Sequence, residues 1–174
     1  VDNCLVKMVD PLLMGIAIQK KVTAAGKSVV KANPQEKVGV FCKKNGKPSV
    51  VEYTEIPKEM AEATDDRGEL IYGESHILCN LFNIDAVERM GSKPLPYHSA
   101  FKKATYIDKD GNKVIPDGPN AYKFEAFLFD AFGELDDMAI LRVNREEEFA
   151  PVKNAAGVDS PETARELYKK FYKL

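Results

Sequence analysis

Two charged side chains stand at positions where α/β proteins often bind ligands. The sequence begins inside a predicted element, and Asp2 stands where a buried strand should end. Open α/β sheets bind ligands in the crevice at their strand ends, so an acid there is a candidate for holding a metal ion or a polar ligand. Lys153 follows the charged stretch 145–149 and is expected directly after a strand. A lysine in that place can meet a phosphate as a point charge.

Glu52 is a third candidate, on a predicted strand. The alternation in 50–56 puts Glu52 and Thr54 on one face of that strand. A carboxylate on a rigid strand can accept hydrogen bonds from two neighbouring sugar hydroxyls, and such charge-assisted bonds are stronger than neutral ones. By residue type alone, an acid that simply faces solvent is the commoner case. The pattern therefore leaves both interpretations open.

The chain carries no signature of hydrolytic or zinc chemistry. His76 and His98 are its only histidines, and neither stands in a metal-ligand spacing. The sequence contains no Walker loop, no G-x-G-x-x-G segment and no evident pair of nucleophile and base. A single histidine near an apolar strand is usually a hydrogen-bonded structural residue, which is the default interpretation of both.

Alternating helices and strands, with hairpins inserted, are expected to position these side chains. Asp10-Pro11 is typical of a helix start, and the apolar residues that follow predict a buried helix. Asn45-Gly46 between two β-rich segments predicts a hairpin. Strands are expected at 28–31, 38–43, 48–54, 77–82, 104–107, 113–115 and 138–144, and helices at 10–18, 57–63, 85–90, 122–135 and 160–174.

Three of these elements carry specific expectations. The segment 77–82 is continuously apolar, as in a strand buried on both faces. Phenylalanines and leucines at helical spacing predict the helix over 122–135. The last helix begins at the cap Ser160 and should pack its apolar face, with Tyr168 and Tyr172, on the domain. The whole is predicted to be a mixed α/β sheet carrying excursions.

Composition limits the classes of function. The 174 residues suit about one domain, and a net charge of −2 gives no electrostatic reason to expect nucleic acid. The apolar run 12–18 is too short to span a bilayer, so no membrane partner is expected. Cys4, Cys42 and Cys79 are far apart and lie in apolar runs, which predicts buried free thiols and a cytoplasmic protein.

Four ordered segments together resemble the eukaryotic-type UDP-N-acetylhexosamine pyrophosphorylases, within the UDP-sugar pyrophosphorylase family. Their order and spacing match across nearly the whole chain. The segments are Val1-Asp2-Asn3-x-Leu5-Val6-Lys7 with Asp10-Pro11, Val38-Gly39-Val40 followed by Val51-Glu52-Tyr53-x-Glu55-Ile56, Lys123-x-Glu125-x-Phe127-x-Phe129-Asp130, and Arg145-Glu146-x-Glu148-Phe149-x-Pro151-x-Lys153-Asn154.

This resemblance implies a partial Rossmann-like nucleotidyltransferase fold and an enzyme that joins UTP to a hexose 1-phosphate, releasing pyrophosphate with Mg²⁺. Residues 1–154 would be the carboxyl-terminal, sugar-binding half of the catalytic domain, and 155–174 a linker and helix. The implied roles are metal binding for Asp2, close backbone approach to the sugar for Gly39, hydroxyl binding for Glu52, the pocket wall for Phe127 and Phe129, and neutralisation of phosphate charge for Lys153.

Two departures from the family pattern shape the expectation. The glycine-rich UTP loop and an Asn-Gly-Gly segment that helps hold uracil and sugar do not occur here. The chain alone is therefore predicted to have no turnover and to need an amino-terminal part of the same enzyme. Ser75-His76-Ile77 replaces the family's Gly-Asn-Ile, so His76 joins the sugar pocket in place of an asparagine. N-acetylglucosamine 1-phosphate is the expected substrate. Glucose or galactose 1-phosphate, or a non-catalytic sugar-nucleotide-binding module, are the alternatives.

Overall fold

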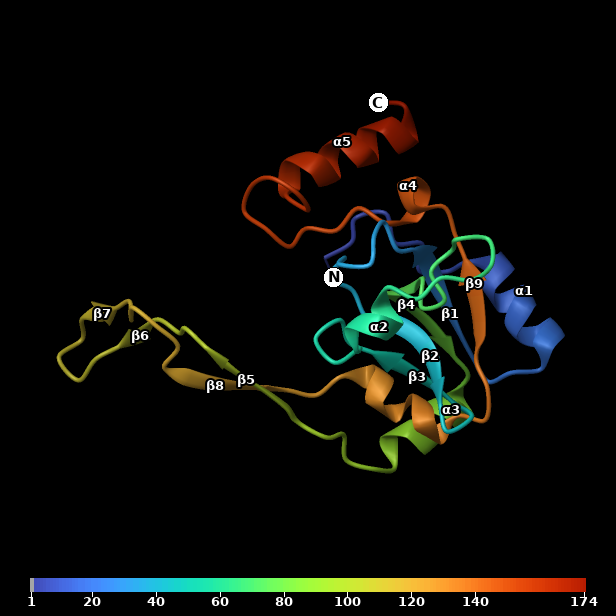
Figure 1. The fold of residues 1–174 in the computed structure, drawn as a ribbon, viewed down its shortest axis with the longest axis horizontal. Coiled ribbons are helices and arrows are strands. Elements are labelled where there is room, and N and C mark those ends of the chain that lie inside the picture. Colours follow the sequence, from blue (N-terminus) through green and yellow to red (C-terminus); the bar gives the residue numbers. More distant parts are fainter. Residues whose placement is uncertain (1) are drawn as a thin grey trace.

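A five-stranded mixed sheet forms the centre of the chain (Figure 1). The computed structural model describes residues 2–174, and Val1 of the first motif lies outside the described residues. The strand order is β3-β2-β4-β1-β9, with β1 and β9 parallel and the other pairs antiparallel. This confirms the predicted mixed α/β sheet with hairpin excursions.

The bounds of the elements are as follows. The helices are α1 Pro11–Lys20, α2 Lys58–Ala61, α3 Ile84–Gly91, the 3-10 helix η1 Leu128–Glu134, α4 Arg145–Glu148 and α5 Pro161–Tyr172. The strands are β1 Ala24–Val30, β2 Val40–Lys44, β3 Lys47–Val51, β4 Glu74–Phe82, β5 His98–Lys102, β6 Tyr106–Ile107, β7 Lys113–Val114, β8 Ala121–Glu125 and β9 Ala139–Arg142.

Helices cover both faces of the central sheet. Because successive side chains of a strand point to opposite faces, Ala24 and Ala25 of β1 belong to two different apolar clusters. Ala24 packs with α3 and η1, where Phe132 and Leu135 are fully buried. Ala25 packs with the inner face of α1. The sheet is thus held between two apolar layers.

The first helix begins as predicted but is only half-buried. The Asp10 side chain accepts a hydrogen bond from the Leu12 N–H at 2.8 Å, and a proline occupies the first turn. Leu13 and Ala17 are buried, whereas Leu12 and Ile18 are 61% and 77% exposed. The prediction of a buried helix was wrong because only one stripe of the apolar run faces the sheet.

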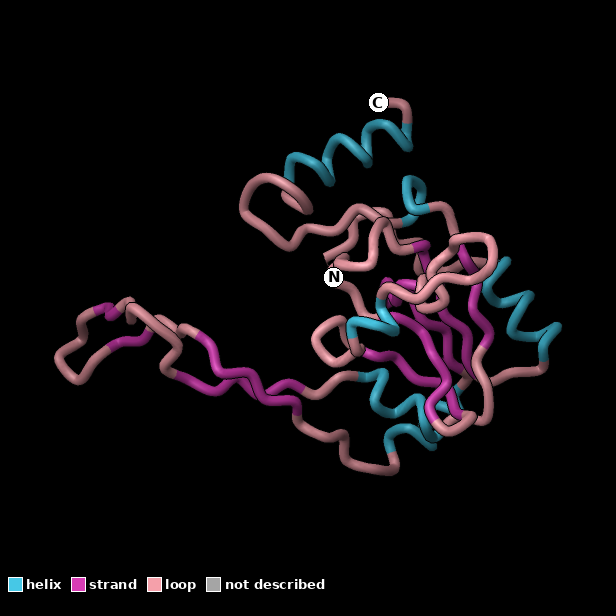
Figure 2. Tube along the Cα trace, in the orientation of Figure 1, coloured by secondary structure: helices cyan, strands magenta, loops and turns pink. Residues whose placement is uncertain are grey.

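A long two-stranded arm projects from the body (Figures 1 and 2). Strands β5 and β8 pair antiparallel, from His98 with Glu125 to Lys102 with Ala121, and β6 and β7 close the tip. The tip hairpin was predicted, but the helix over 122–135 was wrong. Its first residues form β8 because β5, distant in sequence, supplies their hydrogen-bond partners, and Phe124 is left 62% exposed. Only η1 retains helical structure.

Strand β1 is longer than expected, and its partner β4 bulges. Gly26 precedes the expected strand 28–31 but lies inside β1, where a Cβ atom would come within 2.8 Å of the Met138 side chain. Opposite Lys27, the register of β4 shifts between Asn80 and His76. Leu78 in this bulge has φ +56° and is 65% exposed. The prediction that β4 is buried on both faces was therefore wrong at its centre.

The last helix docks on the body through three side chains. Ala164, Leu167 and Phe171 pack against Leu5 and Ala150. The helix begins at Ser160 with a reciprocal capping box, as predicted. The tyrosines do not join this face, since Tyr168 and Tyr172 are 39% and 52% exposed.

The cysteines agree only in part with the expectation of buried free thiols. Cys4, Cys42 and Cys79 are all free. Cys79 is buried, Cys42 is partly covered and Cys4 is exposed, because its segment is a turn rather than a strand. Over residues 2–174, no helix is both long and apolar enough to cross a membrane.

Candidate functional site

One cavity collects every side chain that the sequence singled out. It has a volume of about 270 Å³, and we call it the Glu52 cavity. All seven candidate residues line it, although they come from five separate parts of the chain. Its lining is Asp2, Lys37, Val38, Gly39, Glu52, His76, Ile77, Leu78, Ala126, Phe127, Leu128, Phe129, Phe149 and Lys153.

Glu52 and Gly39 are placed together by the β2–β3 hairpin. Glu52 follows the last residue of β3, so the expectation of a strand through residue 54 was wrong. Its carbonyl instead accepts hydrogen bonds from the Glu55 and Ile56 N–H groups in a turn. A Cβ atom on Gly39 would lie 2.9 Å from both Glu52 Oε1 and Val50 Cγ1. Glycine at 39 is thus required for the Glu52 carboxylate to lie where it does.

The Glu52 carboxylate is partly desolvated and lies among other charges. Burial raises its pKa, and the neighbouring Glu55 adds to that rise, while His98 and Lys153 oppose it. A carboxylate short of water in a cavity gains most from a ligand that donates hydrogen bonds to it. The side chain therefore suits hydroxyl or amide donors.

Asp2 and Lys153 lie on two segments that are bound to each other. The Val152 N–H donates to the Asp2 carbonyl at 2.6 Å, and Asn3 forms an isolated bridge with Pro151. Neither residue lies at the end of a strand of the sheet, so that expectation was wrong for both. The pairing of these two loops nevertheless brings the carboxylate and the ammonium group to one cavity.

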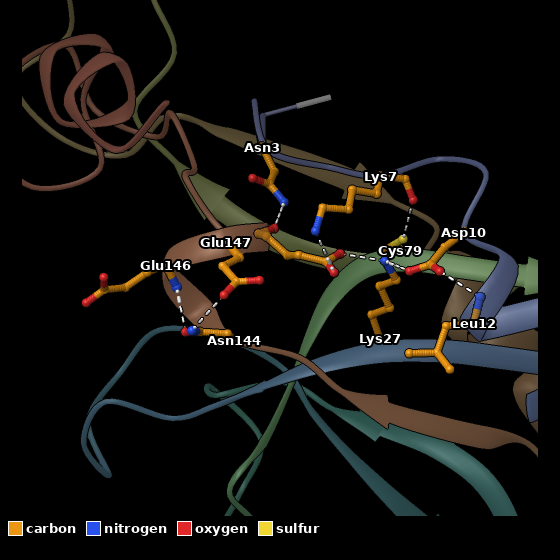
Figure 3. Close-up of polar contacts among 10 residues, drawn as sticks. Asn3, Lys7, Asp10, Leu12, Lys27, Cys79, Asn144, Glu146 and Glu147 are labelled. Carbon is orange, nitrogen blue, oxygen red and sulfur yellow. Dashed lines mark hydrogen bonds and ion pairs between the residues drawn. The ribbon is translucent and has the colours of Figure 1, made fainter. Parts of the chain in front are cut away.

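The Asn3 side chain holds this pair of loops in register. Its Nδ2 donates to the Glu148 carbonyl at 2.7 Å (Figure 3). Its Oδ1 accepts from the Ala150 N–H at 2.8 Å. Asn3 is 4% exposed, so these bonds are protected from water. The motif that contains Asp2 thus carries its own positioning side chain.

Behind these loops lies a buried group of charges. Lys27 is fully buried, and its Nζ lies 2.5 Å from both Asp10 Oδ2 and Glu148 Oε2 (Figure 3). Lys7 Nζ lies 3.4 Å from the other oxygen of Glu148. Burial alone would lower the pKa of Lys27, but Asp10 and Glu148 together raise it. This ion group connects β1 to the loops that carry Asp2 and Lys153.

Stacked aromatic rings form one wall of the Glu52 cavity. The Phe127 and Phe129 rings are 4.9 Å apart and nearly parallel, at 13°. Phe127 lies in the connection from β8 to η1, and Phe129 is in η1. Stacked rings and a carboxylate in the lining of one cavity suit a ligand with one apolar face and one hydroxyl-bearing edge.

His76 closes the floor of the Glu52 cavity as an uncharged ring. It is 9% exposed and its Nε2 lies 3.2 Å from the Asn80 side chain. The edge contacts of its ring are with Phe41, Phe129 and Phe132. Burial, opposed by the hydrogen bond with Asn80, lowers its pKa to about 4. His76 can thus offer a neutral hydrogen bond to a ligand but no charge at pH 7.

The carboxylates of the Glu52 cavity could hold a cation only if a bound ligand supplied further oxygen atoms to it. Within the described part of the chain, no group of three or more His, Cys, Asp or Glu side chains could hold a metal ion. Asp2 lines the cavity and is exposed. Mg²⁺ is commonly held by one or two carboxylates together with substrate phosphates. The residues present therefore fit a magnesium site that a phosphate would complete.

Among the lining residues that were not identified as site residues from the sequence, Lys37 and Leu78 are the most informative. Lys37 precedes the Val38-Gly39 motif and is a second lysine, with Lys153, in the cavity lining. Its position next to a quoted motif was a usable signal. Leu78 reaches the cavity only because β4 bulges, and the apolar run that contains it carries no sign of a bulge.

Comparison with known proteins decides the family. The model of the family described as UTP–glucose-1-phosphate uridylyltransferase matches residues 1–159. The chain belongs to this family. A UDP-N-acetylhexosamine pyrophosphorylase-like protein from Homo sapiens is 43% identical over 95% of this chain and 34% of its own length. The chain thus spans about a third of the length of the curated relatives that it matches.

Solved structures of relatives confirm the fold. A putative UDP-N-acetylglucosamine pyrophosphorylase from Entamoeba histolytica superposes with a TM-score of 0.85 and 33% identity, covering 97% of this chain and 42% of that one. A mutant UDP-glucose pyrophosphorylase from Leishmania major superposes with a TM-score of 0.61 and 18% identity, covering 95% of this chain and 35% of that one. The latter likeness is one of fold alone.

Proposed function

We propose that the Glu52 cavity binds N-acetylglucosamine 1-phosphate, and that the chain is the hexose-binding part of an enzyme that joins this sugar phosphate to UTP. The products would be UDP-N-acetylglucosamine and pyrophosphate. The supporting observation is that all seven residues implied by the family resemblance line one cavity. Residues 1–154 would form the hexose side of the catalytic domain, and 155–174 a linker and a docked helix.

The roles follow from the chemistry of the lining. Glu52 would accept hydrogen bonds from sugar hydroxyls, and Phe127 and Phe129 would pack on the apolar face of the ring. Lys153 and Lys37 would neutralise phosphate charge. Asp2 would hold Mg²⁺, which when bound adds further neutralisation of that charge.

The proposed reaction needs no protein nucleophile. An oxygen of the sugar phosphate would attack the α-phosphorus of UTP in line, and pyrophosphate would leave. Such transfer depends on alignment and on stabilisation of phosphate charge. The ammonium groups of Lys37 and Lys153, which line the same cavity as Glu52, would stabilise the phosphate charge, and the rest of the lining would orient the sugar.

The preference for the N-acetyl sugar is supported by the relatives. Those at 37–43% identity are named for UDP-N-acetylhexosamine or UDP-N-acetylglucosamine, whereas the UDP-glucose pyrophosphorylases are near 20%. His76 provides a neutral ring nitrogen in the cavity, which suits an acetamido group as well as a hydroxyl. A cytoplasmic location is also proposed, on the support of three free thiols.

Calorimetric titration of the chain with N-acetylglucosamine 1-phosphate and with glucose 1-phosphate tests the binding. We expect saturable binding of the first and weaker binding of the second. Glu52→Ala should weaken binding about tenfold or more, as for loss of a charge-assisted hydrogen bond. Glu59→Ala, an exposed acid of α2, should leave it unchanged. No saturable binding of either compound would refute the proposal, and equal binding would refute the sugar preference.

A second experiment separates enzyme from binding module. We expect no release of pyrophosphate from UTP and N-acetylglucosamine 1-phosphate by the 174 residues alone. A longer protein in which a glycine-rich Arg-Leu-Gly loop precedes this sequence should release it, and Lys153→Ala in that protein should lower turnover. A folded protein with the loop that binds the sugar phosphate but makes no UDP-sugar would instead support the non-catalytic module.

A further inference from the structure

His98 stands at the base of the arm, next to the aromatic wall of the Glu52 cavity. It is the first residue of β5 and is paired across the arm with Glu125, the last residue of β8. Its ring centroid lies 4.9 Å from that of Phe127, at an interplanar angle of 48°. His98, Phe127 and Phe129 thus form a continuous series of three rings, of which only the last two line the cavity.

Two acids from different elements face the two nitrogens of the His98 ring. Nε2 lies 2.9 Å from Asp130 Oδ2 of η1, and Nδ1 lies 3.5 Å from Glu55 Oε1 in the turn after β3. The Asp130 side chain is 17% exposed and that of Glu55 53% exposed. The contact with Asp130 is therefore the shorter and better protected one, and it fixes the orientation of the ring.

Asp130 belongs to one of the four family segments, but the resemblance implies no contact between it and a ligand. It follows Phe129 directly, but it does not line the Glu52 cavity. Its backbone N–H donates to the Phe127 carbonyl at 3.1 Å, so it is bound to the wall by its main chain as well. Its side-chain Oδ2 contacts the His98 Nε2 at 2.9 Å.

We propose that Asp130 and His98 are positioning residues, which hold Phe127 flat against Phe129 and so set the wall of the Glu52 cavity. The Asp130 carboxylate orients the imidazole, and the imidazole packs at a tilt against the Phe127 ring, which in turn stacks on Phe129. The consequence for ligand affinity rests on the proposed function. The consequence for ring packing does not.

The first test measures ring packing in the free chain. Nuclear Overhauser effects between the ring protons of Phe127 and Phe129 should be strong in the wild type, since the centroids are 4.9 Å apart. We expect them to weaken in His98→Ala and equally in Asp130→Ala. Asp130→Asn keeps an acceptor oxygen and should retain wild-type intensities. Unchanged intensities in His98→Ala would overturn the proposal.

Tyr97→Ala is the matched control. Tyr97 is the neighbouring aromatic residue at the same end of β5 and is 77% exposed, so its loss should leave the Phe127–Phe129 signals unchanged. A weakening equal to that of His98→Ala would mean that any change at the base of the arm loosens the wall, and would overturn the specific role of His98.

The second test measures affinity for N-acetylglucosamine 1-phosphate. His98→Ala and Asp130→Ala should each weaken binding about two- to tenfold, the range of one aromatic contact. The double variant should be no weaker than either single one, because both changes release the same ring. Additive losses would overturn the proposal. If the wild type does not bind the sugar phosphate at all, the proposed function fails, and the ring measurement still decides the positioning role.

Discussion

Replacing Lys27 with methionine removes the only cation that contacts both Asp10 and Glu148 among the described residues. Lys27 is fully buried, with its Nζ 2.5 Å from a carboxylate oxygen of each. After the change, the Glu148 side chain, 8% exposed, keeps only Lys7 at 3.4 Å. Asp10 keeps only backbone donors of α1. The variant therefore leaves charge buried without its main partner.

The expected loss follows from that geometry. Breaking a buried ion pair by removing one partner typically costs about 3–5 kcal/mol. Lys7 remains near Glu148, which argues for the lower end, or about 3 kcal/mol. Globular domains have about 5–15 kcal/mol of stability in total, so this loss is a large fraction. With a urea slope of about 2 kcal/mol/M, the midpoint should fall by about 1.5 M.

Urea unfolding followed by circular dichroism gives the measurement. Lys44→Met, an exposed lysine of β2, is the control and should stay within about 0.5 kcal/mol of the wild type. The hydrogen bond from Lys27 is the main cause that holds the pKa of Asp10 below its ordinary 3.8. A lowered carboxylate pKa stabilises the fold above that value and loses its effect as pH falls through the folded pKa. The difference between Lys27→Met and wild type should therefore shrink below about pH 3.8.

A Lys27→Met protein within about 1 kcal/mol of wild type at pH 7 would mean that the buried ion group does not stabilise the fold. The same outcome would remove the argument that Lys27 connects β1 to the loops of Asp2 and Lys153.

Three further predictions concern the Glu52 cavity. Burial raises the pKa of Glu52 above its ordinary 4.5, so the affinity for the sugar phosphate should begin to fall at a pH above 4.5 as the pH is lowered. Glu52→Gln should show only the titration of the ligand phosphate. Identical pH profiles of affinity for wild type and Glu52→Gln would contradict this. Gly39→Ala places a Cβ atom 2.9 Å from Glu52 Oε1, and should weaken binding measured by calorimetry with a stability loss of about 1–3 kcal/mol; unchanged affinity would show that Glu52 need not lie there. NMR titration should find a pKa of about 4 for His76, and a value near 6.5 would contradict its burial.

Elements fixed by local chemistry were predictable from the sequence. Asn45-Gly46 has positive φ at both residues, as its hairpin turn requires, and β2 and β3 flank it as expected. The caps Asp10 and Ser160 begin α1 and α5 where predicted. In each case, the residues that determine the element are adjacent in the chain.

Elements fixed by distant partners were not predictable in this way. Tyr122 and Phe124 keep helical spacing with later residues, but β5 supplies a strand partner and the arm results. A strand was expected only from residue 28, whereas Gly26 lies inside β1, where the close approach of Met138 and Phe41 makes glycine necessary. The bulge at Leu78 depends on the register of β4 against β1, which no local signal carries.

The candidate residues were found through motifs, and their placement explains why the motifs work. The motifs of Gly39 and Glu52 occur together because a side chain at position 39 would displace the Glu52 carboxylate. Asp2 and Lys153 are brought together by pairing of their loops. The Asp130–His98 contact was missed because the two residues are 32 positions apart and His98 stands in no quoted motif.

The central claim is that the Glu52 cavity holds a hexose phosphate, and chemical-shift mapping tests it most directly. Titrating N-acetylglucosamine 1-phosphate into the isotope-labelled chain should shift the backbone signals of Gly39, Glu52, His76, Phe127 and Lys153 with a single dissociation constant. Signals of the arm tip, at β6 and β7, should stay in place. Shifts confined to other surfaces, or no shifts at saturating ligand, would contradict the account.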